Sequence, residues 1–207
     1  MHNTPEPGPT VFIVDDDDAV GDGIKLLLRS VKLPCQRLRS AQEFLDNYRP
    51  GAAGCVLLDV RMPGMSGLEL QREMGRRGIA LPIIFMTGHG DVQMAVEAMR
   101  QGAMDFLQKP FREEELLQKI RAALARDAES RAGREQREAS RRLLETLTPR
   151  EREIAGRVAR GQANKVVAAE LGLSQRTVEV HRARVMEKLQ VRSVAELVKV
   201  VLAAGGE

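Results

Sequence analysis

The sequence predicts two domains: an α/β domain with a doubly wound, five-stranded parallel sheet, and a small all-α domain of four helices. In roughly the first 125 residues, short apolar runs alternate with amphipathic segments. This alternation is typical of a parallel sheet that is covered by helices on both faces. The remainder of the chain has only helical patterns, and 207 residues are enough for two small domains.

The charge of the chain is divided in a similar way. Residues 1–130 contain 16 Lys and Arg against 19 Asp and Glu, a net charge of −3, whereas residues 131–207 contain 16 against 10, a net charge of +6. A basic domain is suited to binding the phosphate backbone of a nucleic acid. The alternative explanation is that the surface charge is simply uneven and serves no partner. Aromatic residues make up 3% of the chain, which disfavours a protein that stacks single-stranded bases on aromatic rings.

Composition disfavours several other classes of protein. The longest apolar runs are far shorter than the ~20 residues that span a bilayer. The N-terminal stretch lacks the basic and apolar regions of a secretory signal. Cys35 and Cys55 are too few for a disulfide scaffold or a four-ligand zinc site, and His2, His89 and His181 are too scattered for a metal site. We therefore expect a reduced, cytoplasmic protein.

Five apolar runs predict the strands of the first domain. The run at 11–14 is rich in β-branched residues, and the run at Cys35–Leu38 is a weaker candidate. The next two are nearly all apolar, as expected for strands buried on both faces. The fifth is short and leads to Lys109. These last three runs cover residues 55–58, 81–86 and 105–107.

Helical patterns separate these strands. In the first pattern apolar residues recur at helical spacing, although Gly21 and Gly23 weaken its start. A capping box formed by Ser40 and Glu43 opens the second. Gly102 is placed to end the fourth. The four helices are predicted at 19–31, 40–48, 67–74 and 91–100.

A long helical pattern begins at Arg112 and extends to about residue 145. Its apolar stripe fades after Leu124 and the pattern becomes strongly charged. We expect the last helix of the first domain to continue as an exposed helical linker at 126–145, which is favoured over a dimerising coiled coil. The predicted domains therefore cover residues 9–125 and 146–207.

Capping signals divide the rest of the chain into four helices. Thr148 and Glu151 form a capping box with Pro149 at the first helical position, and this helix should end at Gly161. The next three helices are predicted at 164–171, from Ser174 to about residue 189, and from Ser193 onwards.

Polar residues end four of the five predicted strands, at the sheet edge where doubly wound folds bind ligands. They are Asp15 with Asp16, Asp59, Thr87 and Lys109. Because the first and third strands are neighbours in such a sheet, the aspartates should converge. Close carboxylates repel each other unless a cation lies between them, and Mg²⁺ suits carboxylate and phosphate oxygens. A carboxylate beside Mg²⁺, an ammonium group and a hydroxyl is equipped to accept a phosphoryl group.

The stretches 14–17, 58–67, 87–91 and 109–111 resemble the receiver domain of two-component response regulators, which has a flavodoxin-like fold. The resemblance covers roughly residues 9–126. It implies that a sensor histidine kinase phosphorylates Asp59. It further implies that Asp15, Asp16, Asp59 and the backbone carbonyl of Arg61 hold Mg²⁺, that Lys109 binds the phosphoryl group, and that Thr87 and Phe106 act as a switch.

An enzyme is the alternative hypothesis. The run of four aspartates also fits the motif of haloacid-dehalogenase-like phosphatases, with Asp15 as the nucleophile. That interpretation needs a later acidic pair, and Gly90 and Asp91 are not followed by a suitable second aspartate. It also leaves Asp59 without a role, so we disfavour it.

The C-terminal part has the layout of a helix-turn-helix, in which a turn containing Gly172 joins a short helix to a polar one. Val178 and Val185 would pack the polar helix inward, leaving Arg182 and Arg184 free to bind phosphates. On spacing alone, a helical bundle with a charged outer face is an equal alternative.

The stretches 147–153, 161–165 and 174–181 resemble the LuxR-type DNA-binding domain, and the likeness spans about residues 143–207. Together with the first domain, the chain resembles NarL/FixJ-type response regulators, closer to the FixJ branch. The resemblance places Lys165, Thr177, Val180, His181 and Arg184 at or near DNA, and Arg176 and Arg182 lie on the same helix. The sequence departs from the family at Ala155 and Gly156, where bulkier apolar residues are common, so the first helix of this domain is expected to be marginal.

We therefore expect a transcription regulator and not an enzyme, since the receiver would assist only its own aspartyl phosphorylation and dephosphorylation. Its expected partners are promoter DNA, a sensor histidine kinase and a second copy of the chain, which pairs on phosphorylation. RNA polymerase is a further candidate partner, Mg²⁺ is the one expected cofactor, and no membrane association is expected.

Overall fold

The computed structural model describes residues 8–88 and 92–205. The chain divides after Ser130 into two compact units, at the point that separates the acidic from the basic part of the sequence. In the described part of the chain, no helix is both long and apolar enough to cross a membrane.

The first unit contains the predicted five-stranded sheet, and every pair of neighbouring strands is parallel. The strand order is β2-β1-β3-β4-β5. The predicted fold class is therefore confirmed. The strands are β1 (Thr10–Val14), β2 (Cys35–Leu38), β3 (Gly54–Asp59), β4 (Ile83–Thr87) and β5 (Asp105–Gln108). Strand β4 begins two residues later than predicted, because Pro82 has no backbone N–H to donate to the ladder.

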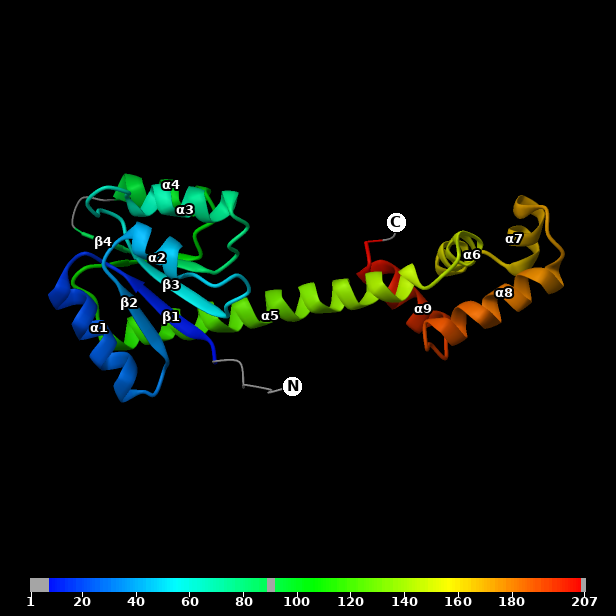
Figure 1. Cartoon of the computed structure of the whole chain (residues 1–207), viewed down its shortest axis with the longest axis horizontal. Coiled ribbons are helices and arrows are strands. Elements are labelled where there is room, and N and C mark those ends of the chain that lie inside the picture. Colours follow the sequence, from blue (N-terminus) through cyan, green and yellow to red (C-terminus); the bar gives the residue numbers. More distant parts are fainter. Residues whose placement is uncertain (1–7, 89–91, 206–207) are drawn as a thin grey trace. The chain divides into compact units, whose positions relative to one another are not determined.

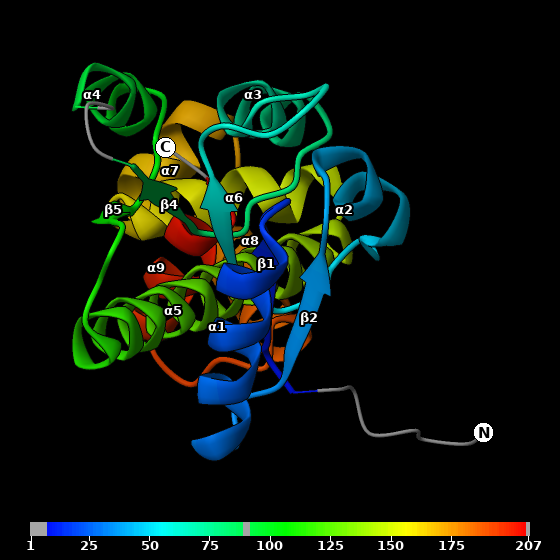
Figure 2. The same ribbon diagram turned by 90° about the vertical axis from the view of Figure 1, so that its left-hand side faces the viewer.

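Five helices surround this sheet, and Figure 2 shows α1 and α5 on one face and α2, α3 and α4 on the other. Their bounds are α1 (Asp18–Ser30), α2 (Ala41–Asn47), α3 (Gly67–Arg76), α4 (Val92–Arg100) and α5 (Glu113–Glu145). The predicted start of α4 at Asp91 and the expected positions of His2 and His89 lie outside the described residues. Ser40 caps α2 as predicted, by accepting a hydrogen bond from the backbone N–H of Glu43.

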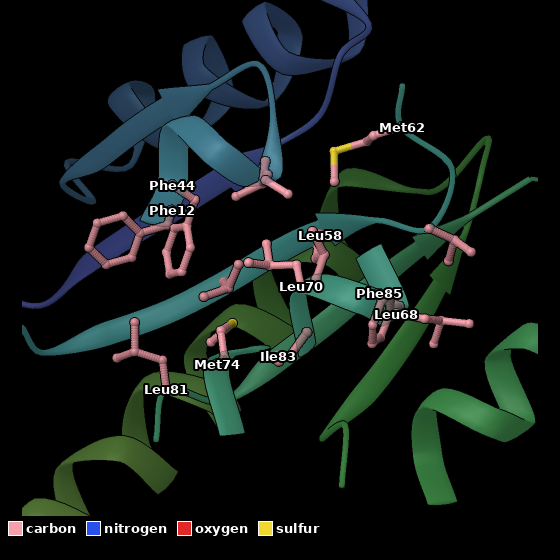
Figure 3. Packing of buried hydrophobic residues seen from close by; sticks show 14 of the residues in the cluster. Phe12, Phe44, Leu58, Met62, Leu68, Leu70, Met74, Leu81, Ile83 and Phe85 are labelled. Atoms are coloured by element: carbon pink, nitrogen blue, oxygen red, sulfur yellow. The ribbon is translucent and has the colours of Figure 1, made fainter. Parts of the chain in front are cut away.

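Each central strand contributes alternate side chains to two separate cores. Phe12, Val56 and Phe85 pack toward α2, α3 and α4, as Figure 3 shows for the labelled residues, whereas Val11 and Leu57 pack toward α1 and α5. Both faces of the sheet are therefore buried, which explains why the interior positions of these strands are apolar in succession and do not alternate with polar residues.

Helix α5 contributes residues to the cores of both units (Figure 1). Most of its residues between 126 and 145 are exposed, but Asp127 and Ser140 are buried. A carboxylate oxygen of Asp127 accepts a hydrogen bond of 2.9 Å from the backbone N–H of Gly54, at the start of β3. Gly54 has a φ of 148°, and a Cβ there would lie 1.9 Å from the carbonyl oxygen of Thr10. This close approach requires glycine and directs its amide toward α5.

The second unit is an all-α domain whose four helices surround a single apolar core. The helices are α6 (Pro149–Ala159), α7 (Asn164–Leu171), α8 (Gln175–Lys188) and α9 (Val194–Ala203). Thr148 and Glu151 form the predicted capping box, and Gly161 and Gly172 follow α6 and α7 with positive φ. The side chain of Lys188 in α8 bonds a carboxylate oxygen of Glu151 at 2.6 Å, which joins α6 to α8 and lowers the pKa of Glu151 to about 2.

We expect Asp127→Ala to destabilise the first unit. The substitution leaves the backbone N–H of Gly54 buried without its partner, which costs about 1–3 kcal/mol. Urea unfolding of the full chain, followed by circular dichroism, measures the loss. Glu129→Ala removes an exposed carboxylate two residues away on the same helix and should change the unfolding free energy little. Equal effects of the two substitutions would contradict the role of Asp127.

Gly156→Ala should stabilise α6, because alanine is favoured over glycine by about 1 kcal/mol in a helix interior. The new Cβ would lie 3.6 Å from the nearest atom, on the side chain of Arg160, which is an ordinary contact. Amide hydrogen exchange of α6 should slow in the full chain. Gly161→Ala is the control and should destabilise, since Gly161 has a φ of 80°. Unchanged or faster exchange in Gly156→Ala would show that packing, and not helix propensity, limits α6.

Candidate functional site

The register of the sheet brings Asp15 and Asp59 to the same edge. Val14 in β1 pairs with Leu58 in β3, so the two aspartates that follow them lie side by side at the carboxyl ends of neighbouring strands. Both are almost fully buried, with 0% of Asp15 and 8% of Asp59 exposed. Two buried carboxylates on neighbouring strand ends require a positive charge close by.

Lys109 supplies that charge. Its Nζ lies 2.7 Å from a carboxylate oxygen of Asp15 and 2.5 Å from one of Asp59. The lysine follows β5, and its backbone N–H donates a 2.7 Å hydrogen bond to the carbonyl oxygen of Thr87 in β4. Burial would lower the pKa of Lys109, but its bonds to the two aspartates outweigh burial, so the pKa is raised and the ammonium stays charged.

The second oxygen of each aspartate is bound by its own loop. Asp15 accepts a hydrogen bond of 2.9 Å from the backbone N–H of Asp17, and Asp59 accepts one of 2.7 Å from the backbone N–H of Arg61. Each carboxylate is thus held between the shared ammonium and an amide two residues further along the chain. Burial raises the pKa of Asp59, and its bonds to Lys109 only partly oppose this effect. Two carboxylates share this one ammonium, so an additional cation would complete the charge balance of the cluster.

The four consecutive aspartates have different environments. Asp15 belongs to the buried cluster, and Asp16 is exposed beside it. Asp17 is the N-cap of α1, where its side chain accepts hydrogen bonds from two backbone N–H groups. Asp18 forms ion pairs with Arg37 and Arg39, which lower its pKa.

Sequence reasoning missed the role of Arg37. Its side chain is 9% exposed and lies across α1, where it pairs with Asp18 and Asp22. A Cβ at Gly21 would lie 2.3 Å from the guanidinium nitrogen Nε of Arg37. The glycine that weakens the helical pattern therefore makes room for the arginine. A glycine inside an otherwise helical pattern was the available signal.

The two predicted switch residues occupy different environments. Thr87 is 4% exposed, and its hydroxyl lies 3.5 Å from the carbonyl oxygen of Leu107, to which it donates a long hydrogen bond. Phe106, on the edge strand β5, is 44% exposed. Among the described residues, the side chains of Thr87 and Phe106 form no hydrogen bond with Asp15, Asp59 or Lys109.

The donor set at this edge fits a hard divalent cation. Asp15 and Asp59 already direct oxygens at one shared cation, and Mg²⁺ accepts one or two carboxylates and keeps several waters. The described residues contain no group of three or more His, Cys, Asp or Glu arranged as a complete metal cage. An ion here would therefore depend on water, phosphate oxygens and backbone carbonyls for its remaining ligands.

The predicted DNA-binding residues lie on α7 and α8 of the second unit (Figure 1). The hydroxyl of Thr177 forms a hydrogen bond of 2.8 Å with the hydroxyl of Ser174, the N-cap of α8. His181 is half-buried, and its Nδ1 has no hydrogen-bond partner among the described residues. Lys165, Arg176, Val180 and Arg184 are exposed.

The cations of the second unit fall into two groups. Arg157 pairs with Glu153 and Glu170, and Arg182 donates to the side-chain oxygen of Asn164 in α7. These bonds hold the helices together, as does the pair of Lys188 and Glu151. In contrast, Lys165, Arg176 and Arg184 form no hydrogen bond or ion pair through their side chains with any described residue. The second group is therefore available to bind external anions.

Comparisons with known proteins agree with this division. Residues 11–121 match the family model of the response regulator receiver domain. Residues 145–201 match that of bacterial regulatory proteins of the luxR family. Neither match is to a phosphatase, so the alternative with Asp15 as a nucleophile has no support.

Relatives cover nearly the whole chain. The transcriptional regulatory protein FixJ of Azorhizobium caulinodans is 46% identical over 97% of this chain and 95% of its own length. Nodulation protein W of Bradyrhizobium diazoefficiens is 47% identical over 91% of this chain and 83% of its own length.

Solved structures give the same result. The response regulator StyR has a TM-score of 0.83 and 46% identity, covering 94% of this chain and 98% of that one. Full-length FixJ from B. japonicum has a TM-score of 0.60 and 39% identity, covering 96% and 98%. With a receiver domain followed by a LuxR-type DNA-binding domain, the chain belongs to the response regulators of the NarL/FixJ type.

Proposed function

We propose that Asp59 accepts a phosphoryl group from a sensor histidine kinase and that this reaction controls the binding of promoter DNA by α7 and α8. The observation that carries the proposal is the position of the Asp59 carboxylate. One of its oxygens lies 2.5 Å from Nζ of Lys109, which also binds the neighbouring carboxylate of Asp15. Membership of the response-regulator family supports the same assignment.

The reaction joins a carboxylate oxygen of Asp59 to phosphorus and breaks the bond between phosphorus and the donor's leaving atom. The transferring phosphoryl group is negatively charged throughout the reaction. The ammonium of Lys109 lies beside the acceptor oxygen, where it can stabilise that charge. Asp15, Asp16, Asp59 and the backbone carbonyl of Arg61 would hold Mg²⁺, which supplies a further positive charge to the phosphoryl oxygens. The role of the chain's own groups is to fix the carboxylate and balance charge.

A hollow beside Lys109 gives a phosphodonor partner a place to bind. It has a volume of about 550 Å³ and is lined by Val20 and Leu27 of α1 and by Pro110 and Phe111 after β5. Leu26, on α1, is 72% exposed. An apolar surface next to the acceptor supports docking of the kinase here, since exposed apolar patches commonly mark protein interaction sites.

Signalling would then pass through Thr87 and Phe106. The long hydrogen bond from Thr87 to the carbonyl oxygen of Leu107 is a weak restraint, so the hydroxyl can turn toward a phosphoryl oxygen. Movement of the threonine leaves space that the ring of Phe106 can fill, which gives the receiver two alternative arrangements.

Dimerisation is the proposed consequence. Val96 and Met99 on α4 and Phe106 on β5 are large apolar side chains that are 42–47% exposed. A change at Phe106 would alter this surface and favour pairing of two receivers. A dimer matches the two-fold symmetry of an operator and places two recognition helices on it. RNA polymerase is a further proposed partner, and the proposed location is the cytoplasm.

We propose three functional segments: a receiver at 9–125, a helical linker at 126–145 and a DNA-binding domain at 146–207. The matched ranges 11–121 and 145–201 support these bounds. In the DNA-binding domain, Lys165, Arg176 and Arg184 are proposed to bind phosphates through side chains that have no partner among the described residues. Arg182 can bind Asn164 and a phosphate together, because a guanidinium has five N–H donors.

Asp59→Asn should abolish labelling of the protein by a small phosphodonor in the presence of Mg²⁺, because an amide cannot form the acyl phosphate. Phosphate incorporation, followed by mass spectrometry, measures the result. Asp46→Asn removes an exposed carboxylate on α2 and should be labelled as the wild type is. Persistent labelling of Asp59→Asn would assign the acceptor to another carboxylate, with Asp15 and Asp16 as the first to test.

Arg184→Ala should weaken binding to all duplex sequences alike and reduce the slope of log affinity against log salt by about 1, as expected for loss of one phosphate contact. Titration of labelled duplex DNA at several salt concentrations provides the measurement. Lys199→Ala, which removes an exposed cation on α9, controls for the change in net charge and should leave the slope nearly unchanged. A sharply altered sequence preference would instead make Arg184 a base-reading residue.

A further inference from the structure

The outward face of α8 has an unusual charge distribution. Val178 and Val185 are 0–1% exposed and fix the side of the helix that packs on the domain. The side chains that point away from this core all have exposed surfaces: Arg176, Glu179, Val180, Ala183 and Arg184. Glu179 and Glu187 are the two acids of this helix, and Glu179 is the one in the first half of the proposed recognition helix.

Glu179 has no partner that would explain its presence. The carboxylates of Glu151, Glu153 and Glu170 are each paired with a basic side chain of the same unit. The side chain of Glu179 forms no hydrogen bond or ion pair with any residue that the structure describes. Arg176 and Arg182 lie three residues before and after Glu179, within reach on a helix, but neither pairs with it in the described structure, and Ala183 occupies the position four residues on.

The neighbours of Glu179 indicate which part of DNA this segment would meet. Ala183 lies one helical turn from both Glu179 and Val180, so the three side chains are adjacent on the helix surface. Val180 is 45% exposed. Neither valine nor alanine can bind a phosphate, whereas apolar side chains do contact the methyl group of thymine in the major groove. This segment is therefore suited to base edges, with Arg176 and Arg184 placed to bind the backbone.

A carboxylate is repelled by phosphates, so an unpaired one at a DNA surface is favoured where a base offers a hydrogen-bond donor. In the major groove the donors are the amino groups of cytosine and adenine. On adenine the neighbouring N7 is an acceptor and repels a carboxylate, whereas glutamate accepts well from the amino group of cytosine. We propose that Glu179 reads a cytosine in the major groove and is a specificity-determining residue of this protein. This inference rests on the proposed DNA binding through α8.

The test is a selection of bound sequences from random duplex DNA, carried out with the full chain. Glu179→Gln keeps the size of the side chain, and Glu187→Gln makes the same change at an exposed position near the end of the same helix. The wild type and Glu187→Gln should select cytosine at one position of each half-site. Glu179→Gln should lose that preference by on the order of tenfold and gain adenine there, since glutamine pairs with adenine.

Retention of the cytosine preference in Glu179→Gln would overturn the proposal. Tighter binding of both variants with unchanged base preference would also overturn it, because Glu179 would then act only through its charge. A wild type that binds duplex DNA without any base preference contradicts the inference but leaves DNA binding intact. A wild type that binds no duplex at low salt would instead refute the proposed function of α8, and the Glu187→Gln control would fail with it.

Discussion

The ammonium of Lys109, shared by Asp15 and Asp59, is the interaction on which the receiver depends. The three residues come from β1, β3 and the end of β5, so they meet only when the sheet has its observed order and register. Two buried carboxylates would otherwise oppose folding, because each raises the free energy of ionising the other. The same arrangement makes Asp59 a fixed, partly compensated carboxylate at the edge of the sheet, which is the property that an acceptor of a phosphoryl group needs.

Charge compensation also organises the DNA-binding unit. Arg157, Arg182 and Lys188 use their side chains to join α6, α7 and α8, whereas Lys165 on α7 and Arg176 and Arg184 on α8 have no side-chain partner among the described residues. The excess of positive charge in the second half of the sequence is therefore divided between structural bonds and a surface available to phosphates. Helix α5 belongs to both units, and the bond from Gly54 to Asp127 ties it to the start of β3.

Local patterns predicted most of the fold. The five strands, the N-cap at Ser40, the capping box at Thr148 and the turns at Gly161 and Gly172 depend on residues within a few positions of one another. The meeting of Asp15, Asp59 and Lys109 could also be predicted, because strand ends in a parallel sheet share one edge. The contact of Arg37 with Gly21 and that of Asp127 with Gly54 could not, since they join segments far apart in sequence through packing that no local periodicity encodes.

The central claim is that the state of Asp59 controls the DNA-binding surface of the second unit. The affinity of the full chain for a selected duplex, measured with and without a small phosphodonor and Mg²⁺, tests it most directly. The affinity should rise on treatment of the wild type and stay constant for Asp59→Asn. An equal rise in both proteins, or no change in the fully phosphorylated wild type, would contradict control of DNA binding through this carboxylate.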